Sequence, residues 1–408
     1  MILLLSLNFL NSAQAFDLPE FSAVHHLNTK STAPVSMASV KNFRVQVFPH
    51  FGAYSTPQGR EASASSVEIT SDEDCVGYEA VLDANQEWTK GEATGDSNSD
   101  LKFNSTGADR NAYYACTKPF VINRTTPLQS IPYSGDFVVV IARGKVRVIN
   151  IIDPDTYVKG VIPTEVEASW PMESLKAQAV ATRTYAWYSV LESRATVSDI
   201  DMDDTVSYQA YMGNAKRAAT SDLSADQTEG LVMLYSGVVI KSYFSADSGG
   251  YTEAAAEVFG ALPYCIAKPE SYDLTAYATT SWTKTFSSAD LTSLLVGAGS
   301  LRSGVIVQNV VVNDTDRTAS GRARNVTITS ADGEVFTVSG PDFRYATKVR
   351  SDLFTVSSSG GSFTFNGKGY GHGVGMAQIG AWQYAKQLNW TYDQILKFYY
   401  DGVTITHD

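Results

Sequence analysis

Short alternating runs between residues 42 and 150 restrict the possible folds more than any other feature of the sequence. Apolar and polar residues alternate in each run, and clusters of Gly, Asp, Asn and Ser separate the runs FRVQVF, SSVEIT, GYEAVL, PFVIN, DFVVVIA and KVRVINII. Such alternation is typical of strands with one buried face, and the clusters are typical of turns. We therefore predict a β-rich region with edge hairpins, in which the polar segment ATGDSNSDLKFNSTGADRN is a surface loop.

A helix is predicted directly after this region. Pro171 opens the pattern, which continues to about Glu192, with Ser169 or Trp170 as the cap. The apolar positions that recur at helical spacing predict a buried stripe formed by Leu175, Ala179, Ala186 and Val190.

The rest of the chain mixes further strands with helices. Strands are predicted at GLVMLY, VVIKSYF, VIVQNVVV, NVTIT and EVFTV, and helices at 288–297, at 374–388 and in TYDQILKFYY. Thr391 and Gln394 have the spacing of a capping box for the last of these helices. The pattern predicts an α+β fold, in which β-rich strand groups are interrupted by a few helices and form a substrate groove.

The N-terminal run MILLLSLNFLNSAQA predicts the compartment. It ends in Ala13-Gln14-Ala15, the small-x-small pattern of a signal-peptidase site, so we expect residues 1–15 to be a signal peptide and 16–41 a flexible leader. The run is too short to span a bilayer, and no later stretch is long and apolar enough for a transmembrane segment. We therefore expect an exported protein of the periplasm or cell envelope.

Charge and cysteine content narrow the classes of partner. The net charge of −12 argues against nucleic acid or an anionic membrane surface, because both select basic patches. Cys75 and Cys116 lie in polar sequence and can pair in an oxidising compartment, which leaves Cys265 over in a stretch typical of a half-buried position. The histidines at 25, 26, 50, 372 and 407 are scattered and give no zinc-site spacing.

Glu165 is the first candidate for chemistry. It follows the segment GVIP, interpreted here as a strand leading into a turn, and precedes the predicted helix, so that rigid elements hold it on both sides. A glutamate that apolar neighbours such as Val161 or Trp170 desolvate can work as a general acid near neutral pH. A lone glutamate near a helix start is also commonly a partner of the helix dipole, and this segment alone leaves both interpretations open.

The segment YFSADSGGYTE (243–253) is a second candidate. Gly249 and Gly250 let backbone N–H groups approach a ligand closely, and Tyr243, Ser245 and Ser248 can bond to sugar hydroxyls. A glycine hairpin turn without a ligand fits the same residues equally well.

The segment GKGYGHGVGMAQIGA (367–381) is the third. Its glycines permit close backbone packing and can direct His372 into a cleft, with Tyr370 and Gln378 beside it. A hydrogen-bonded structural histidine is the alternative interpretation of His372. The segment has no Gly-Lys-Ser/Thr, so a phosphate-binding loop is not favoured.

Together the three segments and their flanks resemble the SpoIID/LytB family, which includes stage II sporulation protein D and the amidase enhancers. The stretches that carry the resemblance are DTYVKGVIPTEVEASWPMESLKAQAVATRTYAW, SYFSADSGGYTEAAAEVFGALPYC and GKGYGHGVGMAQIGAWQYAKQLNWTYDQILKFYYDGV. VSYQAYMG and TEGLVMLYSGVVI fall where the family has similar linkers. The resemblance covers about 130–405, with a weaker lead-in from about 42. It implies a catalytic domain at 131–408 behind a β-rich N-terminal region at 42–130, whose insertions match no part of the family.

The resemblance implies a peptidoglycan lytic transglycosylase that acts on glycan strands stripped of stem peptides. Glu165 matches the family's catalytic acid, and the residues of the other two segments are expected to bind the glycan. The same likeness implies a cell-wall amidase as a further partner. Some sporulation members bind zinc after the long helix, but 190–240 has neither Cys nor His, so we expect no metal and no cofactor. A non-catalytic glycan-binding protein or amidase activator is the alternative function.

Overall fold

The computed structural model describes residues 36–47, 66–83, 86–106, 109–125, 128–142, 144–196, 198–270 and 281–408. The predicted signal peptide and most of the predicted leader lie outside these residues. The chain forms two compact units, one made of Met1–Glu165 and Ala186–Ala219 and the other of Val166–Tyr185 and Thr220–Asp408. The expected domain division at residue 131 stays a prediction.

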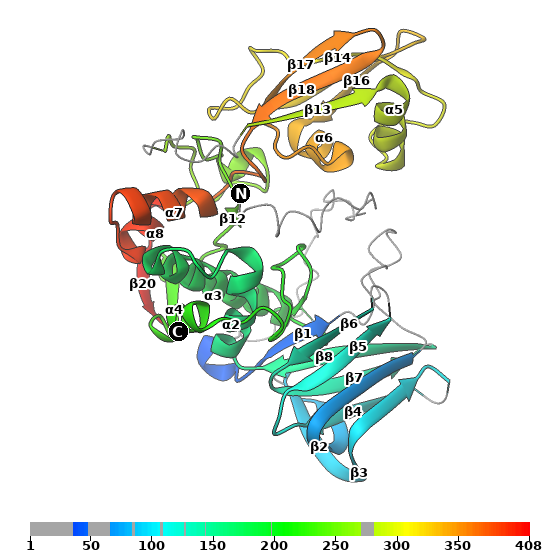
Figure 1. Ribbon diagram of the computed structural model, residues 1–408, viewed down its shortest axis with the longest axis vertical. Coiled ribbons are helices and arrows are strands. Elements are labelled where there is room, and N and C mark those ends of the chain that lie inside the picture. Colours follow the sequence, from blue (N-terminus) through cyan, green and yellow to red (C-terminus); the bar gives the residue numbers. More distant parts are fainter. Residues whose placement is uncertain are drawn as a thin grey trace. The chain divides into compact units, whose positions relative to one another are not determined.

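The first unit is built on a sheet of nine strands among the residues described (Figure 1). The order is β6-β5-β2-β4-β7-β8-β1-β9, and β3 pairs with β2. All neighbours are antiparallel except β1 and β9. The strands are β1 (Phe43–Val47), β2 (Ser66–Leu82), β3 (Trp88–Asn104), β4 (Arg110–Ala115), β5 (Phe120–Thr125), β6 (Leu128–Tyr133), β7 (Asp136–Ala142), β8 (Lys145–Ile152) and β9 (Met202–Asp203).

The described residues of the alternating runs form strands, as predicted, and SVEIT (from Ser66) and GYEAVL lie on one long strand, β2. The prediction of a surface loop was wrong for residues 93–104, which form most of β3, and for Arg110 and Asn111, which begin β4. β3 runs along β2 from Asn104 opposite Ser66 to Trp88 opposite Leu82. Most side chains of β3 are exposed, so neither face of the strand needs apolar residues. Its sequence therefore lacks the apolar–polar alternation of a half-buried strand and resembles that of a loop. The Cys75–Cys116 disulfide ties β2 to the end of β4.

Helices α2 (Pro154–Glu165) and the C-terminal part of α3 (Met172–Arg194) complete the first unit. Phe43 of β1 packs edge-on against Tyr157 of α2 and Trp187 of α3. A buried ionic network lies beside them, in which Asp201 accepts hydrogen bonds from Arg44 and Arg194. All three side chains are fully buried, so each depends on the others for compensation of its charge.

Helix α3 confirms the predicted long helix. The predicted stripe of Leu175, Ala179, Ala186 and Val190 is buried throughout. The expected cap was wrong by one or two residues, because the carbonyl of Pro171 accepts the first helical hydrogen bonds, from Ser174 and Leu175. None of the helices in the described part of the chain has the length and apolarity needed to cross a membrane.

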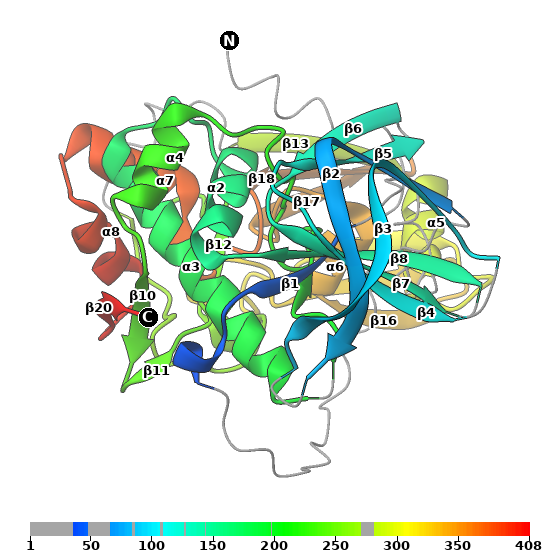
Figure 2. The same ribbon diagram turned by 90° about the horizontal axis from the view of Figure 1, so that it is seen from below.

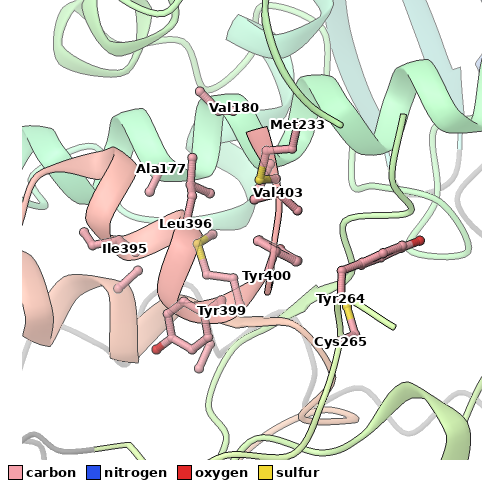
Figure 3. Packing of buried hydrophobic residues seen from close by; sticks show 14 of the residues in the cluster. Ala177, Val180, Met233, Tyr264, Cys265, Ile395, Leu396, Tyr399, Tyr400 and Val403 are labelled. Carbon is pink, nitrogen blue, oxygen red and sulfur yellow. The ribbon is translucent and has the colours of Figure 1, made fainter. Parts of the chain in front are cut away.

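One part of the second unit gathers around a core of α3, α7 (Gln378–Gln387) and α8 (Tyr392–Tyr399) (Figure 3). A small sheet of β11 (Val238–Val239), β10 (Leu231–Tyr235) and β20 (Thr404–His407) borders it, and helix α4 (Ala219–Asp226) precedes β10. The capping box of α8 is present, with Gln394 accepting from Thr391 N at 3.0 Å. Cys265 is buried in this core, contrary to the half-buried position expected, and burial raises the pKa of its thiol to about 12.

The other part of the second unit has two three-stranded sheets and its own apolar core. One sheet has the order β13-β18-β17, from β13 (Ser281–Ser287), β18 (Ser362–Lys368) and β17 (Phe354–Ser359). The other has the order β14-β15-β16, from β14 (Val307–Val311), β15 (Asn325–Ser330) and β16 (Val335–Ser339). Figure 2 labels β13, β17 and β18 of the first of these sheets and β16 of the second. Helices α5 (Ser288–Gly297), at the predicted position, and α6 (Gly340–Thr347) accompany them. The mixture of strand groups and helices confirms the α+β class.

Candidate functional site

Glu165 is the last residue of helix α2, and the expected strand and turn at GVIP was wrong. Asp153 starts the helix, because its carboxylate accepts from Thr156 N at 2.9 Å and its carbonyl accepts from Tyr157 N at 3.0 Å. Pro154 follows in the first helical position, where a missing N–H costs nothing. Pro163 lies inside the last turn of the helix.

One oxygen of the Glu165 carboxylate has a fixed partner. Ala210 N donates to Glu165 Oε1 at 2.8 Å, and the glutamate side chain is half-buried. The segment that carries Ala210 is itself anchored, since Tyr211 Oη donates to Asn150 Oδ1 at 2.9 Å and Tyr157 Oη donates to Gln209 Oε1 at 3.3 Å. The carboxyl group therefore stands between a helix end and an anchored backbone.

Close packing of α2 on this segment depends on a glycine. A Cβ at Gly160 would lie 2.5 Å from Tyr211 Cε2 and 2.8 Å from the carbonyl oxygen of Gly213. Neither distance is tolerable for a real side chain, so only glycine lets the helix approach the 209–213 backbone this closely. The position of Glu165 relative to Ala210 thus follows from Gly160.

The second and third predicted segments lie together in the second unit. β12 (Phe244–Ser245) pairs in parallel with β19 (Met376–Ala377). Asp247 and Tyr370 exchange backbone hydrogen bonds of 3.0 and 2.8 Å, and Glu253 N donates to Gly373 O at 2.8 Å. Residues separated by more than a hundred positions in the sequence therefore form one cluster.

Ser245 and Ser248 both make hydrogen bonds inside this cluster. Ser245 Oγ accepts from Gly373 N at 3.2 Å. Ser248 is fully buried, where its hydroxyl donates to Glu270 and accepts from Gly250 N at 3.0 Å. Gly249 has a φ of +76°, and a Cβ there would lie 3.1 Å from Gly369 N, so this glycine permits the two turns to touch.

His372 is neutral at physiological pH. Its Nδ1 accepts from Val374 N at 3.0 Å, and a hydrogen bond to the backbone of Phe244 engages the ring as well. Burial, followed by the nearby guanidinium groups of Arg344 and Arg322, lowers the pKa of His372 to about 3. The imidazole can therefore hold and orient neighbouring groups as a neutral ring.

Two arginines create this positive surrounding. Arg322 donates to the carbonyls of Ser248, at 2.7 Å, and Tyr251, at 3.0 Å, and pairs with Asp352 at 3.0 Å. A Cβ at Gly373 would lie 2.2 Å from Arg322 Nη2, so the glycine makes room for the guanidinium. Burial lowers the pKa of Arg344, whose Nε has no hydrogen-bond partner among the described residues.

An exposed aromatic group borders His372, and sequence reasoning missed its outermost member. Phe259 stacks on Tyr243, with ring centroids 4.2 Å apart and planes 15° from parallel. The His372 ring meets Phe259 edge-on at 5.0 Å. Phe259 is 42% exposed, so one face of this stack is open to solvent. An aromatic residue in AEVFG gives no sign in the sequence of whether it is buried, so only the structure identifies this surface.

The other two predicted residues border the same cluster. Gln378 is buried and its Nε2 lies 3.4 Å from Gln178 Oε1 of α3. Tyr370 is half-buried, with the Arg350 guanidinium 5.9 Å from its ring centroid, and burial raises its pKa. No three His, Cys, Asp or Glu side chains gather as a metal site in the described parts of the chain. His25, His26 and His50 lie outside these parts, and His407 is in β20.

Known proteins resemble this chain in sequence. The model of the family described as "Stage II sporulation protein" matches residues 142–235, which include Glu165 and its Ala210 partner. Stage II sporulation protein D of Bacillus subtilis is 30% identical over 273 residues, an alignment that covers 63% of this chain and 76% of that protein. The chain belongs to the SpoIID/LytB family. The resemblance seen in the sequence is thereby confirmed.

Other relatives extend the comparison. The amidase enhancer of Bacillus subtilis, a SpoIID/LytB relative, is 35% identical over 295 residues, covering 61% of this chain but only 40% of the enhancer. An uncharacterized protein of Brachyspira hyodysenteriae is 36% identical over 298 residues, covering 68% of this chain and 73% of that protein. A second family model, a domain of unknown function named DUF8618, matches residues 260–375.

Proposed function

We propose that this cell-wall-related protein is a lytic transglycosylase that cleaves the bond between N-acetylmuramic acid and N-acetylglucosamine in peptide-stripped glycan strands. The observation that best supports this proposal is the position of the Glu165 carboxyl group, which lies at a helix end and accepts a hydrogen bond from Ala210 N. A catalytic carboxyl group must keep one orientation, and the hydrogen bond from Ala210 N supports such a role for Glu165.

In the proposed reaction Glu165 acts first as an acid and then as a base. Its protonated carboxyl group gives a proton to the glycosidic oxygen, and the bond from this oxygen to C1 of the muramyl sugar breaks. The carboxylate then takes the proton of the muramyl 6-hydroxyl while that oxygen bonds to C1 and closes the 1,6-anhydro ring. One carboxyl group suffices, because no water has to be activated on the opposite face of the sugar.

The aromatic surface of the second unit supports sugar binding as part of the same proposal. Tyr243 and Phe259 offer flat apolar rings on which a pyranose can stack, and the neutral His372 supports them from the side. The substrate-binding roles of Ser245, Ser248, Gly249, Gly250, Tyr370 and Gln378 are retained in the proposal.

Digestion of peptide-stripped and intact sacculi, followed by mass spectrometry, tests the reaction. Wild-type protein is expected to release fragments with anhydro-muramyl ends, and Glu165→Gln is expected to release none. Glu167→Gln is the matched control, because Glu167 lies two residues away and its carboxylate, among the described residues, accepts a hydrogen bond only from the Ser169 hydroxyl, at 3.4 Å. Reducing ends in place of anhydro ends would indicate hydrolysis, and equal activity of Glu165→Gln would contradict the assignment.

A non-catalytic role is the second candidate, and the amidase enhancer relative favours it. Here the protein grips glycan and stimulates a cell-wall amidase, without cleaving the strand itself. Binding of strands with no products from wild-type protein, together with faster peptide release by an added amidase, would select this role. Export to the periplasm or cell envelope belongs to both candidates and is tested by cell fractionation.

A further inference from the structure

Arg344 of α6 is an arginine for which the fold provides no partner of its own. Its Nε is buried without a hydrogen bond, and no carboxylate in the described ranges forms an ion pair with the guanidinium. The residue is half-buried, and of its three nitrogens Nε alone is both buried and unbonded, so the terminal nitrogens are within reach of a ligand. A charge taken out of water without a partner costs free energy, and a ligand of opposite charge removes that cost.

The carboxylates in this region serve a different arginine. Asp352 attracts the Arg344 guanidinium, but its carboxylate pairs with Arg322 at 3.0 Å, and both members of that pair are buried. Asp247 also interacts with Arg322, and burial raises the pKa of its carboxyl group. Arg344 therefore shares Asp352 with another cation. In a chain with a net charge of −12, a guanidinium left in this position favours an anionic ligand group.

His372 connects Arg344 with the aromatic surface of the second unit. The chain after α6 adjoins the loop of His372, because Gly371 N donates to Arg350 O at 2.8 Å. The Arg344 guanidinium lies near enough to the His372 ring to lower its pKa, and the same ring meets Phe259 edge-on at 5.0 Å. A half-exposed aromatic ring, a neutral imidazole and a cation therefore follow one another within one unit.

We propose that Arg344 binds the lactyl carboxylate of an N-acetylmuramic acid unit whose sugar ring lies on the stack of Phe259 on Tyr243. The inference rests on the proposed function, because it names the sugar that this aromatic surface holds. The lactyl group projects from the edge of the pyranose, so its carboxylate extends past the stack while the apolar face of the sugar covers Phe259. A guanidinium suits this role, since its terminal N–H groups can donate side by side to both carboxylate oxygens.

This contact accounts for the proposed preference for stripped strands. In a strand that carries stem peptides, the lactyl carboxyl group forms an uncharged amide with the peptide. Hydrolysis of that amide leaves a carboxylate on the sugar and releases the peptide as an amine. Hydrogen bonds to a charged acceptor are stronger than those to a neutral one, so Arg344 favours the hydrolysed strand. The reaction that supplies this substrate is therefore amide hydrolysis at the lactyl group.

Calorimetric binding of three glycans tests the proposal. The full chain carries Glu165→Gln, so that no cleavage disturbs the measurement. The ligands are peptide-stripped glycan oligosaccharides, the same oligosaccharides with their lactyl carboxyl groups converted to methylamides, and chitin oligosaccharides of equal length, which lack the lactyl group. The stripped strand is expected to bind about tenfold more tightly than the methylamide strand, the effect of a hydrogen bond between charged groups.

Substitutions of Arg344 are expected to remove this preference and to leave the binding of uncharged glycans intact. Arg344→Gln is expected to bind the stripped strand as weakly as the methylamide strand, and to bind chitin oligosaccharides as its parent does. Arg344→Lys keeps the charge but not the planar group, so it is expected to restore part of the preference. Circular dichroism and unchanged binding of chitin oligosaccharides establish that both variants fold.

Two further variants separate the carboxylate contact from other effects. Arg302→Gln removes an exposed arginine whose Nε donates to Glu334 at 3.0 Å, and it is expected to leave all three affinities unchanged. Phe259→Ala removes the outer ring of the stack and is expected to weaken the binding of all three glycans alike, because the sugar face is common to them.

Four results would overturn the proposal. They are equal affinity of the parent for the stripped and methylamide strands, a preference that persists in Arg344→Gln, equal loss of all three glycans in Arg344→Gln, and displacement of the stripped strand by free stem peptides, which would make Arg344 a receptor for a peptide carboxylate. Failure of this contact is distinct from failure of the reaction. A preference that depends on Arg344, without anhydro products from wild-type protein, would keep the contact and reject the lyase. Anhydro products without the preference would do the reverse.

Discussion

Single residues differ in ways that the sequence does not reveal. Glu165 and Glu173 flank the same segment and are both near a helix end. Glu173 is engaged in structure, because it pairs with Lys176 at 2.9 Å and accepts from Tyr392 N at 2.8 Å. The Glu165 carboxylate instead accepts a hydrogen bond from the backbone N–H of Ala210. The donor is a main-chain group, so its contribution can be tested without removing any side chain.

Ala210→Pro removes the N–H that holds Glu165 Oε1. On the proposed function we expect cleavage to fall at least about tenfold, because a loosely held acid spends less time aligned with the glycosidic oxygen. Ala210→Gly retains the N–H and is expected to keep most of the activity. Circular dichroism establishes that both variants fold, and unchanged cleavage by folded Ala210→Pro would contradict the role of this bond.

His372 makes a second prediction at this scale. Its pKa of about 3 in the folded protein lies below the ordinary value of 6.5, so the unfolded chain binds the proton more readily. Its contribution to the free energy of unfolding is complete above pH 6.5 and is lost as the pH falls towards 3. Denaturation at pH 7 and pH 4 should therefore show a smaller loss of stability in His372→Gln than in wild type. Equal losses would show that the ring is not desolvated.

Among the elements, helix α2 shows where sequence reasoning succeeded and where it failed. The alternating runs, the buried stripe of α3 and the range of α5 were predictable. When one face of a strand or helix is buried, apolar residues recur in the sequence at the period of that element. In α2 the apolar residues of GVIP suggested a strand, and the Asp153-Pro154 start signal was overlooked. β3 was missed for the opposite reason, since an exposed strand has no apolar pattern.

Asp153→Ala is expected to lower the free energy of unfolding of the first unit by about 1 kcal/mol, because it removes the acceptor for Thr156 N. Asp153→Ser keeps an acceptor at the same place and is expected to lose much less. Urea denaturation of the three proteins measures the difference. Equal stability of the alanine and serine variants would mean that the helix start does not depend on this cap.

The candidate site was predictable only as three separate segments. Parallel pairing of β12 with β19 could not be foreseen, because its partners lie more than a hundred residues apart and each strand has two residues. The stack of Phe259 on Tyr243 was equally hidden, since exposure of an aromatic ring follows from the completed fold. Sequence patterns identified candidate residues for chemistry, and tertiary structure decides which of them lie close together.

At the scale of the whole molecule, the division into two units means that the disulfide is expected to stabilise only one of them. Cys75 and Cys116 both belong to the first unit. The disulfide closes a loop between cysteines 41 residues apart, and reduction opens this loop in the unfolded chain. Reduction is therefore expected to lower the free energy of unfolding of the first unit by about 4 kcal/mol. Hydrogen exchange should therefore speed up in β2, β4 and β7 and stay unchanged in β14, β15 and β16. Faster exchange in both sets would show that the units unfold together.

The buried pairing of Arg44 with Asp201 has a consequence for the order of events during synthesis. Arg44 leaves the ribosome early, whereas Asp201 and β9 follow more than 150 residues later. Until then β1 lacks its parallel neighbour and its guanidinium lacks a counter-charge. The first unit therefore cannot finish folding on the nascent chain before α3 has been made, and a chain cut after Glu165 would keep a permanently uncompensated arginine in its core.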